Sequence, residues 1–177
     1  GVANNIEGIR KITAEEVKEI EPFVESIGGI HVPCTGIIDY PAVVFKLAEL
    51  VEGHNVPATL VLGEEVKSID KSKGFSVLNT TKNSYKAKKL IFCGGLQADR
   101  LAKKDGVKLK EKVVPFRGDY YELTEEAKNK VKHLIYPVPN PDFPFLGVHF
   151  TRMTDGEIEC GPNAVFSFKR EGYSRTA

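Results

Sequence analysis

The chain has 177 residues, a net charge of +1 at neutral pH, 41% hydrophobic residues and 28% charged residues. This length suits one domain or one and a half, with enough apolar residues for a core. Acidic and basic residues are interspersed, which disfavours a nucleic-acid-binding protein because such proteins carry a patch of one sign. No apolar run approaches the roughly 20 residues that a membrane-spanning helix needs.

The cysteines and histidines do not form a metal-binding pattern. Cys34, Cys93 and Cys160 are odd in number and widely separated, which disfavours a disulfide framework and fits a reducing compartment. No histidine lies at a metal-ligand spacing from a cysteine or another histidine. We therefore expect no metal site, and a cytoplasmic protein or one that lies peripherally on the inner face of a membrane.

The first third of the chain predicts two helices and a strand. Thr13 followed by Glu16 forms a capping box, which predicts a short helix that ends before Pro22. Residues 28–32 predict a turn and a short strand. Apolar residues recur at helical spacing over residues 40–53, which predicts an amphipathic helix.

The next segment predicts a β-meander. Residues 58–62, 65–70 and 74–81 are expected to be strands, with a hairpin around Ser72–Gly74. A turn at Lys82–Ser84 predicts a further strand that continues the meander.

A continuous apolar run at Leu90–Cys93 is typical of a strand buried on both faces. Gly94 and Gly95 end this strand, and a helix is expected from Gln97 to Lys104. Backbone N–H groups at such a turn can bind a ligand, and the missing Cβ atoms allow a close approach. A simple tight turn is the alternative.

The last third predicts three strands and a stiff loop. A long strand is expected over residues 113–123, interrupted at Gly118, and Thr124 caps a short helix. Residues 136–144 contain four prolines and predict an extended loop. The final strands are expected at 145–151 and 157–161.

Arg117 and two tyrosines form one pattern with chemical potential. An arginine beside a glycine can present its guanidinium group to a carboxylate in bidentate fashion. Tyr120 and Tyr121 point to opposite faces of the strand, so one of them can add a hydroxyl group to a pocket. An ordinary surface arginine on a bulged strand is the alternative.

His149 and Asn163 form the other candidates. His149 lies in an apolar strand, and a histidine can exchange a proton near neutral pH. A histidine in this position is more often a hydrogen-bonded core residue. Asn163 follows Gly161-Pro162, which predicts a turn whose amide can bind either the backbone or a ligand.

Seven motifs follow one another in a fixed order and cover nearly the whole chain. They are Thr35–Tyr40, Cys93–Arg100, Pro115–Tyr121, Ile135–Pro139, Pro144–Thr151, Gly161–Ala164 and Phe168–Tyr173.

This ordered set resembles the L-2-hydroxyglutarate oxidase/dehydrogenase family, whose members are FAD enzymes of the D-amino-acid oxidase and glycerol-3-phosphate dehydrogenase superfamily. The resemblance implies oxidation of a small dicarboxylate, L-2-hydroxyglutarate, to 2-oxoglutarate by hydride transfer to flavin. It also implies that oxygen or a membrane quinone then accepts the electrons.

The resemblance suggests where cofactor and substrate would bind. Val66 matches a position at which related enzymes bind the FAD adenine through a backbone amide, and Cys93, Gly94 and Gly95 match a turn that passes beside the cofactor. On the substrate side, the residue chemistry suggests a carboxylate clamp, a companion hydroxyl group, and a base or a donor that polarises the C2 oxygen. The candidates are Arg117 for the clamp, Tyr120 or Tyr121 for the hydroxyl, His149 for the base or donor, and Asn163 as a further substrate-binding residue.

The expected fold is α+β: a mixed, largely antiparallel substrate-binding sheet with flanking helices, plus a remnant of an FAD-binding α/β domain. Residues 1–54 would form the domain junction, 55–110 the FAD-domain remnant, 111–165 the substrate-domain strands and 166–177 a tail.

The sequence contains no Gly-x-Gly-x-x-Gly loop and does not begin with Met. We therefore expect part of a larger flavin enzyme, which on its own binds FAD weakly or not at all and has no turnover. Apolar surface exposed at the domain interface could support a homodimer. A stand-alone domain for binding a small acid or a partner is the alternative.

Overall fold

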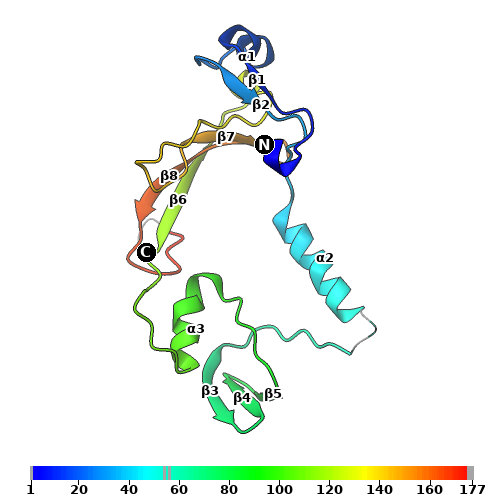
Figure 1. Ribbon diagram of the computed structural model, residues 1–177, viewed down its shortest axis with the longest axis vertical. Coiled ribbons are helices and arrows are strands. Elements are labelled where there is room, and N and C mark those ends of the chain that lie inside the picture. Colours follow the sequence, from blue (N-terminus) through cyan, green and yellow to red (C-terminus); the bar gives the residue numbers. More distant parts are fainter. Residues whose placement is uncertain (1, 54, 56, 175–177) are drawn as a thin grey trace. The chain divides into compact units, whose positions relative to one another are not determined.

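The computed structural model describes residues 2–53, 55 and 57–174 (Figure 1). The chain divides into two compact units: Gly1–Val44 with Gly118–Val165, and Phe45–Arg117 with Phe166–Ala177. The units therefore change at 44/45, 117/118 and 165/166. The sequence analysis expected boundaries at 54/55, 110/111 and 165/166, and residue 54 lies outside the described residues. All three boundaries fall inside a helix or a strand, where loop positions do not indicate a boundary.

The N-terminal part of the first unit is a small α/β motif. After a 3-10 turn, η1 (Val2–Asn4), strand β1 (Arg10–Ile12) pairs antiparallel with β2 (Gly29–His31), and α1 (Ala14–Ile20) connects them. The capping box is confirmed: the Thr13 hydroxyl accepts the Glu16 N–H, and the Glu16 carboxylate accepts the Thr13 N–H at 2.8 Å.

A three-stranded sheet lies largely in the first unit (Figure 1). Its order is β6 (Phe116–Glu122), β8 (Ile158–Phe166), β7 (His149–Arg152), and β7 and β8 are antiparallel. Phe150 and Ile158 belong to one face of the β7–β8 pair, since side chains alternate along each strand. Ile158 is fully buried, and the 3-10 turn η3 (Lys128–Lys130) leads to buried Val131.

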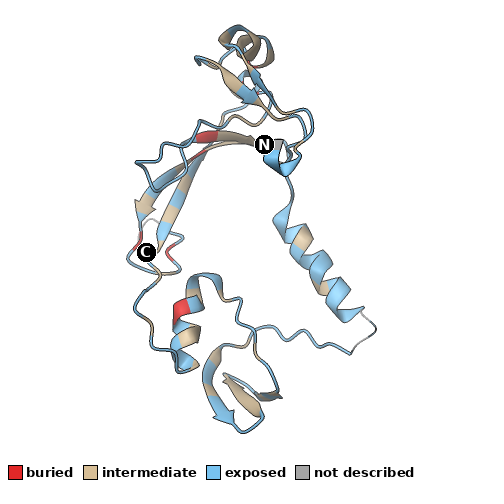
Figure 2. Cartoon of the chain, viewed as in Figure 1, coloured by how far each residue is buried: buried red, intermediate tan, exposed pale blue. Residues whose placement is uncertain are grey.

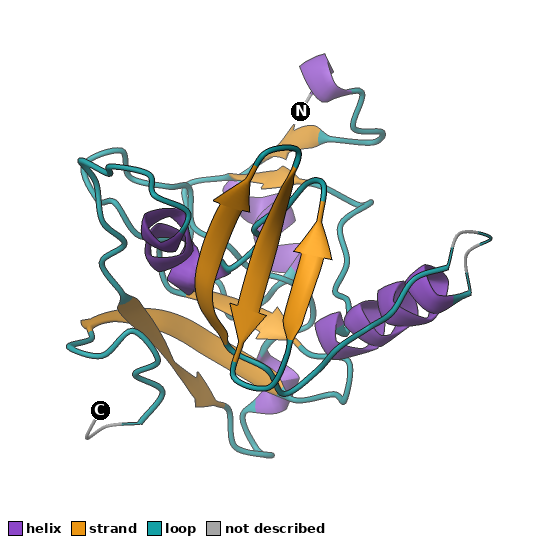
Figure 3. Cartoon of the chain, turned by 90° about the horizontal axis from the view of Figure 1, so that it is seen from below, coloured by secondary structure: helices purple, strands orange, loops and turns teal. Residues whose placement is uncertain are grey.

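The second unit contains the predicted meander, seen in Figure 3. Strands β3 (Val66–Ser72), β4 (Phe75–Thr80) and β5 (Ser84–Ala87) pair antiparallel in that order. The hairpin is confirmed, with Gly74 at a φ of 86° in its turn. A 3-10 turn, η2 (Gly95–Gln97), continues into α3 (Ala98–Lys104), close to the predicted helix. The predicted helix at residues 40–53 is confirmed as α2 (Tyr40–Glu52).

Two predicted strands are absent. Residues 58–62 and 90–93 have no regular secondary structure, and Ile91 is 89% exposed. A strand needs a neighbour to satisfy its backbone N–H and C=O groups. Within the described part of the chain neither run has one, so the apolar composition alone gave the wrong prediction.

Three predictions in the last third need correction. The strand expected at 113–123 is shorter, since β6 begins at Phe116, and it continues through Gly118. The helix expected after Thr124 is a turn followed by η3. Residues 161–163 belong to β8 and form no turn. The pairing of β8 with β7 ends at Gly161, so Pro162 lies where its missing N–H removes no bond to β7.

Many large apolar side chains are exposed. Figure 2 shows that most of the chain is exposed or of intermediate burial. The apolar side chains of α2 illustrate this, because none of them is buried. Among the described residues, no helix is long and apolar enough to cross a membrane.

Candidate functional site

His149 lies on the face of the β7–β8 pair opposite to Ile158. The register pairs His149 with Gly161 and Thr151 with Glu159, so these side-chain positions share one face. This polar face carries an imidazole, a hydroxyl group and a carboxylate, whereas the opposite face carries Phe150, Arg152, Ile158 and Cys160. The polar face is therefore the part of the sheet where chemistry is to be sought.

The environment of His149 fixes its tautomer. The side chain is 6% exposed, and its Nδ1 lies 2.9 Å from the Gly147 carbonyl oxygen. A carbonyl oxygen can only accept, so Nδ1 carries the proton of this hydrogen bond. In the neutral ring, Nε2 then keeps a lone pair and can accept a proton from another group.

Two tyrosine rings enclose the imidazole. Tyr136 stacks on His149 with ring centroids 4.3 Å apart and an interplanar angle of 17°. Tyr120 approaches edge-on, at 6.2 Å and 72°. The Tyr136 hydroxyl lies 3.2 Å from the Thr151 hydroxyl, so Tyr136 is fixed both by its ring and by its hydroxyl group.

Two glycines make room for the Tyr120 ring. A Cβ atom at Gly161 would lie 2.6 Å from Tyr120 Cδ1 and 3.0 Å from the Asp119 carbonyl oxygen. A Cβ at Gly118 would lie 3.3 Å from Tyr120 Cε2. The ring therefore lies directly over backbone that has no side chain, and this contact determines how it faces His149.

The Tyr120 hydroxyl is held in its neutral form. Partial burial of the phenol, which stays 45% exposed, raises its pKa, and the nearby charge of Glu159 raises the pKa further. A neutral phenol keeps its proton over the physiological pH range and can donate a hydrogen bond.

Of the two tyrosines in β6, Tyr120 is the one beside His149. Tyr121 is 70% exposed. Asn163 is also exposed and lies in β8, two residues beyond the position paired with His149. The geometry thus brings Tyr120 and His149 together and leaves Tyr121 and Asn163 on exposed surface.

Arg117 belongs to the second unit and donates hydrogen bonds within that unit. Its Nη1 donates to the carbonyl oxygens of Gly172, at 3.4 Å, and Ser174. The guanidinium group is half-buried and is held by the chain segment that follows β8.

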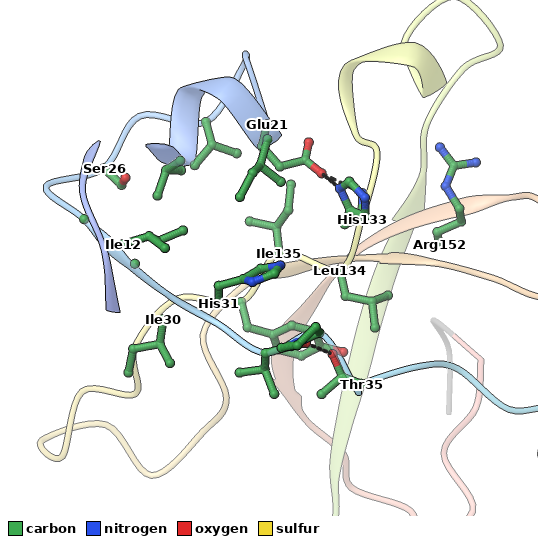
Figure 4. Close-up of a pocket in the computed structure, with 18 of the residues that line it drawn as sticks. Ile12, Glu21, Ser26, Ile30, His31, Thr35, His133, Leu134, Ile135 and Arg152 are labelled. Carbon is green, nitrogen blue, oxygen red and sulfur yellow. Dashed lines mark hydrogen bonds and ion pairs between the residues drawn. The ribbon is translucent and has the colours of Figure 1, made fainter. Parts of the chain in front are cut away.

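A pocket of about 680 Å³ lies in the first unit between α1, β2 and residues 133–136 (Figure 4). Its wall is largely apolar, with polar groups from His31, Thr35, His133 and Arg152. Tyr136 also lines it, so the pocket borders the aromatic group around His149.

A buried carboxylate, Glu21, holds one wall of this pocket in place. It accepts hydrogen bonds from the backbone N–H groups of Lys132 and His133 and lies 2.8 Å from His133 Nδ1. The Glu21–His133 contact is drawn in Figure 4. The Glu21 carboxylate binds Lys132 and His133 of this wall, which indicates a structural role for it.

The predicted cofactor residues are all in the second unit. Val66 begins β3, and its carbonyl oxygen accepts a hydrogen bond from Lys104. Cys93 is an exposed free thiol. Gly94 packs so closely on Leu101 that a Cβ there would lie 2.4 Å from Leu101 Cδ1.

Gly95 has an open backbone, as Gly74, Gly106 and Gly156 also have. Its φ is +49°, and apart from its chain neighbours no atom lies within 4 Å of where a Cβ would stand. Backbone that is open in this way lets a large planar group approach closely, as a flavin cofactor requires. Among the described residues there is no cluster of three or more His, Cys, Asp or Glu side chains that could hold a metal ion.

Sequence reasoning missed several residues of the site. Tyr136 and Thr151 were noted only as parts of motifs, although Tyr136 has the most intimate contact with His149. The available signal was the alternation of side chains along the strand, which puts Thr151 on the face of His149. For Tyr136 the signal is weak, because its position depends on a bridge between Ile135 and Phe150.

Comparison with known protein families gives a match over nearly the whole chain. Residues 2–176 match the sequence profile of a family described as FAD dependent oxidoreductase.

Three curated relatives bear the name L-2-hydroxyglutarate dehydrogenase. The chain is 45% identical over 177 residues to the L-2-hydroxyglutarate dehydrogenase of Indibacter alkaliphilus, covering 99% of this chain and 44% of that protein. It is 42% identical to the enzyme of that name from Escherichia coli K12 and 38% identical to the human mitochondrial one. Each of these two matches covers 98% of this chain and 40% of the relative. The chain thus spans less than half the length of these relatives. The resemblance predicted from the motifs is confirmed.

Solved structures agree on the fold. An L-alpha-glycerophosphate oxidase from Mycoplasma pneumoniae with FAD bound superposes with a TM-score of 0.78 at 26% identity, over 99% of this chain and 47% of that one. A glycine oxidase from Geobacillus kaustophilus superposes with a TM-score of 0.66 at 22% identity, over 92% of this chain and 42% of that one. The mixed α+β class with antiparallel sheets is consistent with both.

Proposed function

The chain belongs to the FAD dependent oxidoreductase family, and from that premise we propose that it forms part of an enzyme that oxidises L-2-hydroxyglutarate to 2-oxoglutarate. The relatives that bear this enzyme's name, at 38–45% identity over at least 98% of the chain, support the substrate. The observation that carries the chemistry is the geometry of His149, a buried imidazole with one nitrogen bound to the backbone and the other able to accept a proton.

The reaction removes a hydride from the substrate carbon C2 and a proton from the hydroxyl group on that carbon. His149 accepts the hydroxyl proton at Nε2, and the Gly147 carbonyl stabilises the imidazolium through Nδ1–H. FAD, when bound, supplies the acceptor for the hydride from C2. Polarisation of the C2 oxygen by a protonated His149 is the alternative role for this residue.

The tyrosines orient the base and the substrate. Tyr136 stacks on His149 and limits the rotation of the ring. Tyr120 stays protonated, and its O–H group can donate a hydrogen bond to a substrate oxygen. Correct placement of base and substrate contributes strongly to rate, because misplacement by about 1 Å can cost 100-fold.

For the substrate carboxylates we retain Arg117 as the clamp, with Tyr121 and Asn163 as further substrate-binding candidates. The guanidinium is suited to a carboxylate because its N–H groups match the two oxygens. These three roles remain predictions.

We propose that FAD is held by the Val66 backbone and the turn at Cys93, Gly94 and Gly95. The open backbone at Gly95 supports this assignment. In domain terms, residues 55–110 would derive from the FAD-binding domain and the strands within 111–165 from the substrate-binding domain. Oxygen or a membrane quinone as electron acceptor, and a homodimer formed through exposed apolar surface, remain predictions.

The test is an assay of the full-length protein loaded with FAD, given L- or D-2-hydroxyglutarate and an artificial electron acceptor. We expect 2-oxoglutarate from the L form only. Absence of product from the L form, with FAD bound and the protein folded, would refute the proposal. His149→Ala should lower turnover at least about 100-fold, which is the low end for loss of a general base.

A further inference from the structure

Asp99 in α3 and Arg170, in the segment after β8, form a buried ion pair within the second unit. Nη1 and Nη2 of Arg170 donate to the two carboxylate oxygens of Asp99, the second at 3.1 Å. The side chains are 8% and 13% exposed, respectively. An ion pair that leaves water must have good geometry and further hydrogen bonds to offset the loss of hydration.

Those further bonds lead to the turn that carries Gly94 and Gly95. Arg170 Nη1 also donates to the Leu96 carbonyl oxygen at 2.6 Å, and Nη2 to the Val113 carbonyl oxygen at 3.2 Å. One guanidinium group therefore binds two carboxylate oxygens and two backbone oxygens. Because its planar fork has a fixed shape, it sets the position of the Leu96 peptide relative to α3.

A second bond strengthens the same connection. Gln97 Nε2 donates to the Glu171 carboxylate at 2.6 Å, so two successive residues of the turn are bound by two successive residues of the segment. The turn begins with Gly94, whose carbonyl oxygen accepts the Gln97 N–H at 2.8 Å.

The segment is itself firmly held. Ser167 donates from its hydroxyl group to the Lys169 carbonyl oxygen at 2.6 Å, and Gly172 packs so closely on Ser167 that any side chain there would clash. The carbonyl oxygens of Gly172 and Ser174 in turn accept hydrogen bonds from Arg117. The same segment thus binds the turn through Arg170 and binds Arg117 through Gly172 and Ser174.

We propose that Asp99 and Arg170 are positioning residues that fix the Gly94-Gly95-Leu96 backbone in the shape that FAD meets. This inference rests on the proposed function, because it takes that turn to be part of the FAD site. The pair acts on this turn through the Leu96 carbonyl group.

The decisive variant separates stability from positioning. Replacing both members, Asp99→Leu with Arg170→Met, removes the buried charges together, and such apolar replacements often keep or restore stability. It also removes the hydrogen bond to Leu96. In the full-length protein we expect this double variant to melt near the wild-type temperature and to bind FAD at least about 10-fold more weakly, the effect of losing one hydrogen bond to a charged group.

Arg170→Lys is the second variant, for the case in which the double variant does not fold. It keeps a cation beside Asp99, but an ammonium group cannot span the carboxylate and both carbonyl oxygens at once. We expect weaker FAD binding, measured by titration of the apoprotein, and a changed visible spectrum of the bound flavin.

Arg10→Met is the matched control, since Arg10 and Glu16 form an ion pair of 2.7 Å that is exposed and lies in the other unit. It should leave FAD affinity unchanged. Wild-type FAD affinity and spectrum in a folded double variant, or in Arg170→Lys, would overturn the inference. Absence of flavin or of L-2-hydroxyglutarate oxidation in the wild-type protein would instead overturn the proposed function, so the two failures are distinguishable.

Discussion

Adding one methyl group at Gly161 should disturb the candidate site without replacing any group that takes part in chemistry. A Cβ there would lie 2.6 Å from Tyr120 Cδ1 and 2.8 Å from Cγ, whereas ordinary contacts begin at 3.4 Å. The ring must therefore move from 2.6 Å to at least 3.4 Å, a displacement of about 0.8 Å. The clash involves the base of the ring and the Asp119 carbonyl oxygen, so rotation of the phenol tip cannot relieve it.

Two quantities follow for Gly161→Ala in the full-length protein. Overpacking should lower the free energy of unfolding by about 1–3 kcal/mol. Displacement of Tyr120 from the edge of His149 should lower kcat about 10- to 100-fold. Steady-state kinetics and thermal melting measure the two effects.

Tyr120→Ala provides the control background. Without the ring, the main clash is removed, so Gly161→Ala should cost much less stability there than in the wild-type protein. Equal destabilisation in both backgrounds, or wild-type kcat for Gly161→Ala, would show that the contact between Gly161 and Tyr120 does not set the geometry of the site.

Three further predictions concern single side chains. Tyr120→Phe should raise KM about 10-fold through loss of a hydroxyl donor. It should leave the pH profile of kcat unchanged, since the raised pKa of Tyr120 keeps the phenol neutral. Disappearance of the alkaline limb of the kcat profile in this variant would contradict the prediction. Ile158→Ala should lower the free energy of unfolding by about 2–5 kcal/mol, as measured by denaturant titration, because the side chain is fully buried; a loss under 1 kcal/mol would contradict a packed core. The Arg170 guanidinium holds the pKa of Asp99 below its ordinary 3.8, so Asp99 stabilises the fold above that pH and this contribution is lost as the pH falls below it. Asp99→Asn should therefore lose less stability than the wild-type protein on acidification. An unchanged dependence of stability on acid pH would contradict the pairing.

Local patterns predicted the elements that depend on local physics. The capping box at Thr13, the amphipathic helix at residues 40–52 and the hairpin at Gly74 are all defined by residues a few positions apart. His149 was selected as a candidate in this way, because a titratable group in an apolar strand stands out from its neighbours.

The remainder depends on distant contacts. The stack of Tyr136 on His149 requires an extended loop to pair with β7, and the Asp99–Arg170 pair joins residues 71 positions apart. The runs at 58–62 and 90–93 have the composition of strands, yet a strand also needs a neighbour, which composition does not reveal.

The most direct test of the account is the rate at which substrate reduces the bound flavin. Full-length wild-type protein and His149→Ala, both loaded with FAD, are mixed anaerobically with L-2-hydroxyglutarate, and loss of the visible flavin absorption is followed. The wild-type protein should be reduced rapidly, and His149→Ala at least about 100-fold more slowly with similar substrate affinity. Equal rates of reduction in the two proteins would contradict the assignment of His149 as the group that accepts the hydroxyl proton.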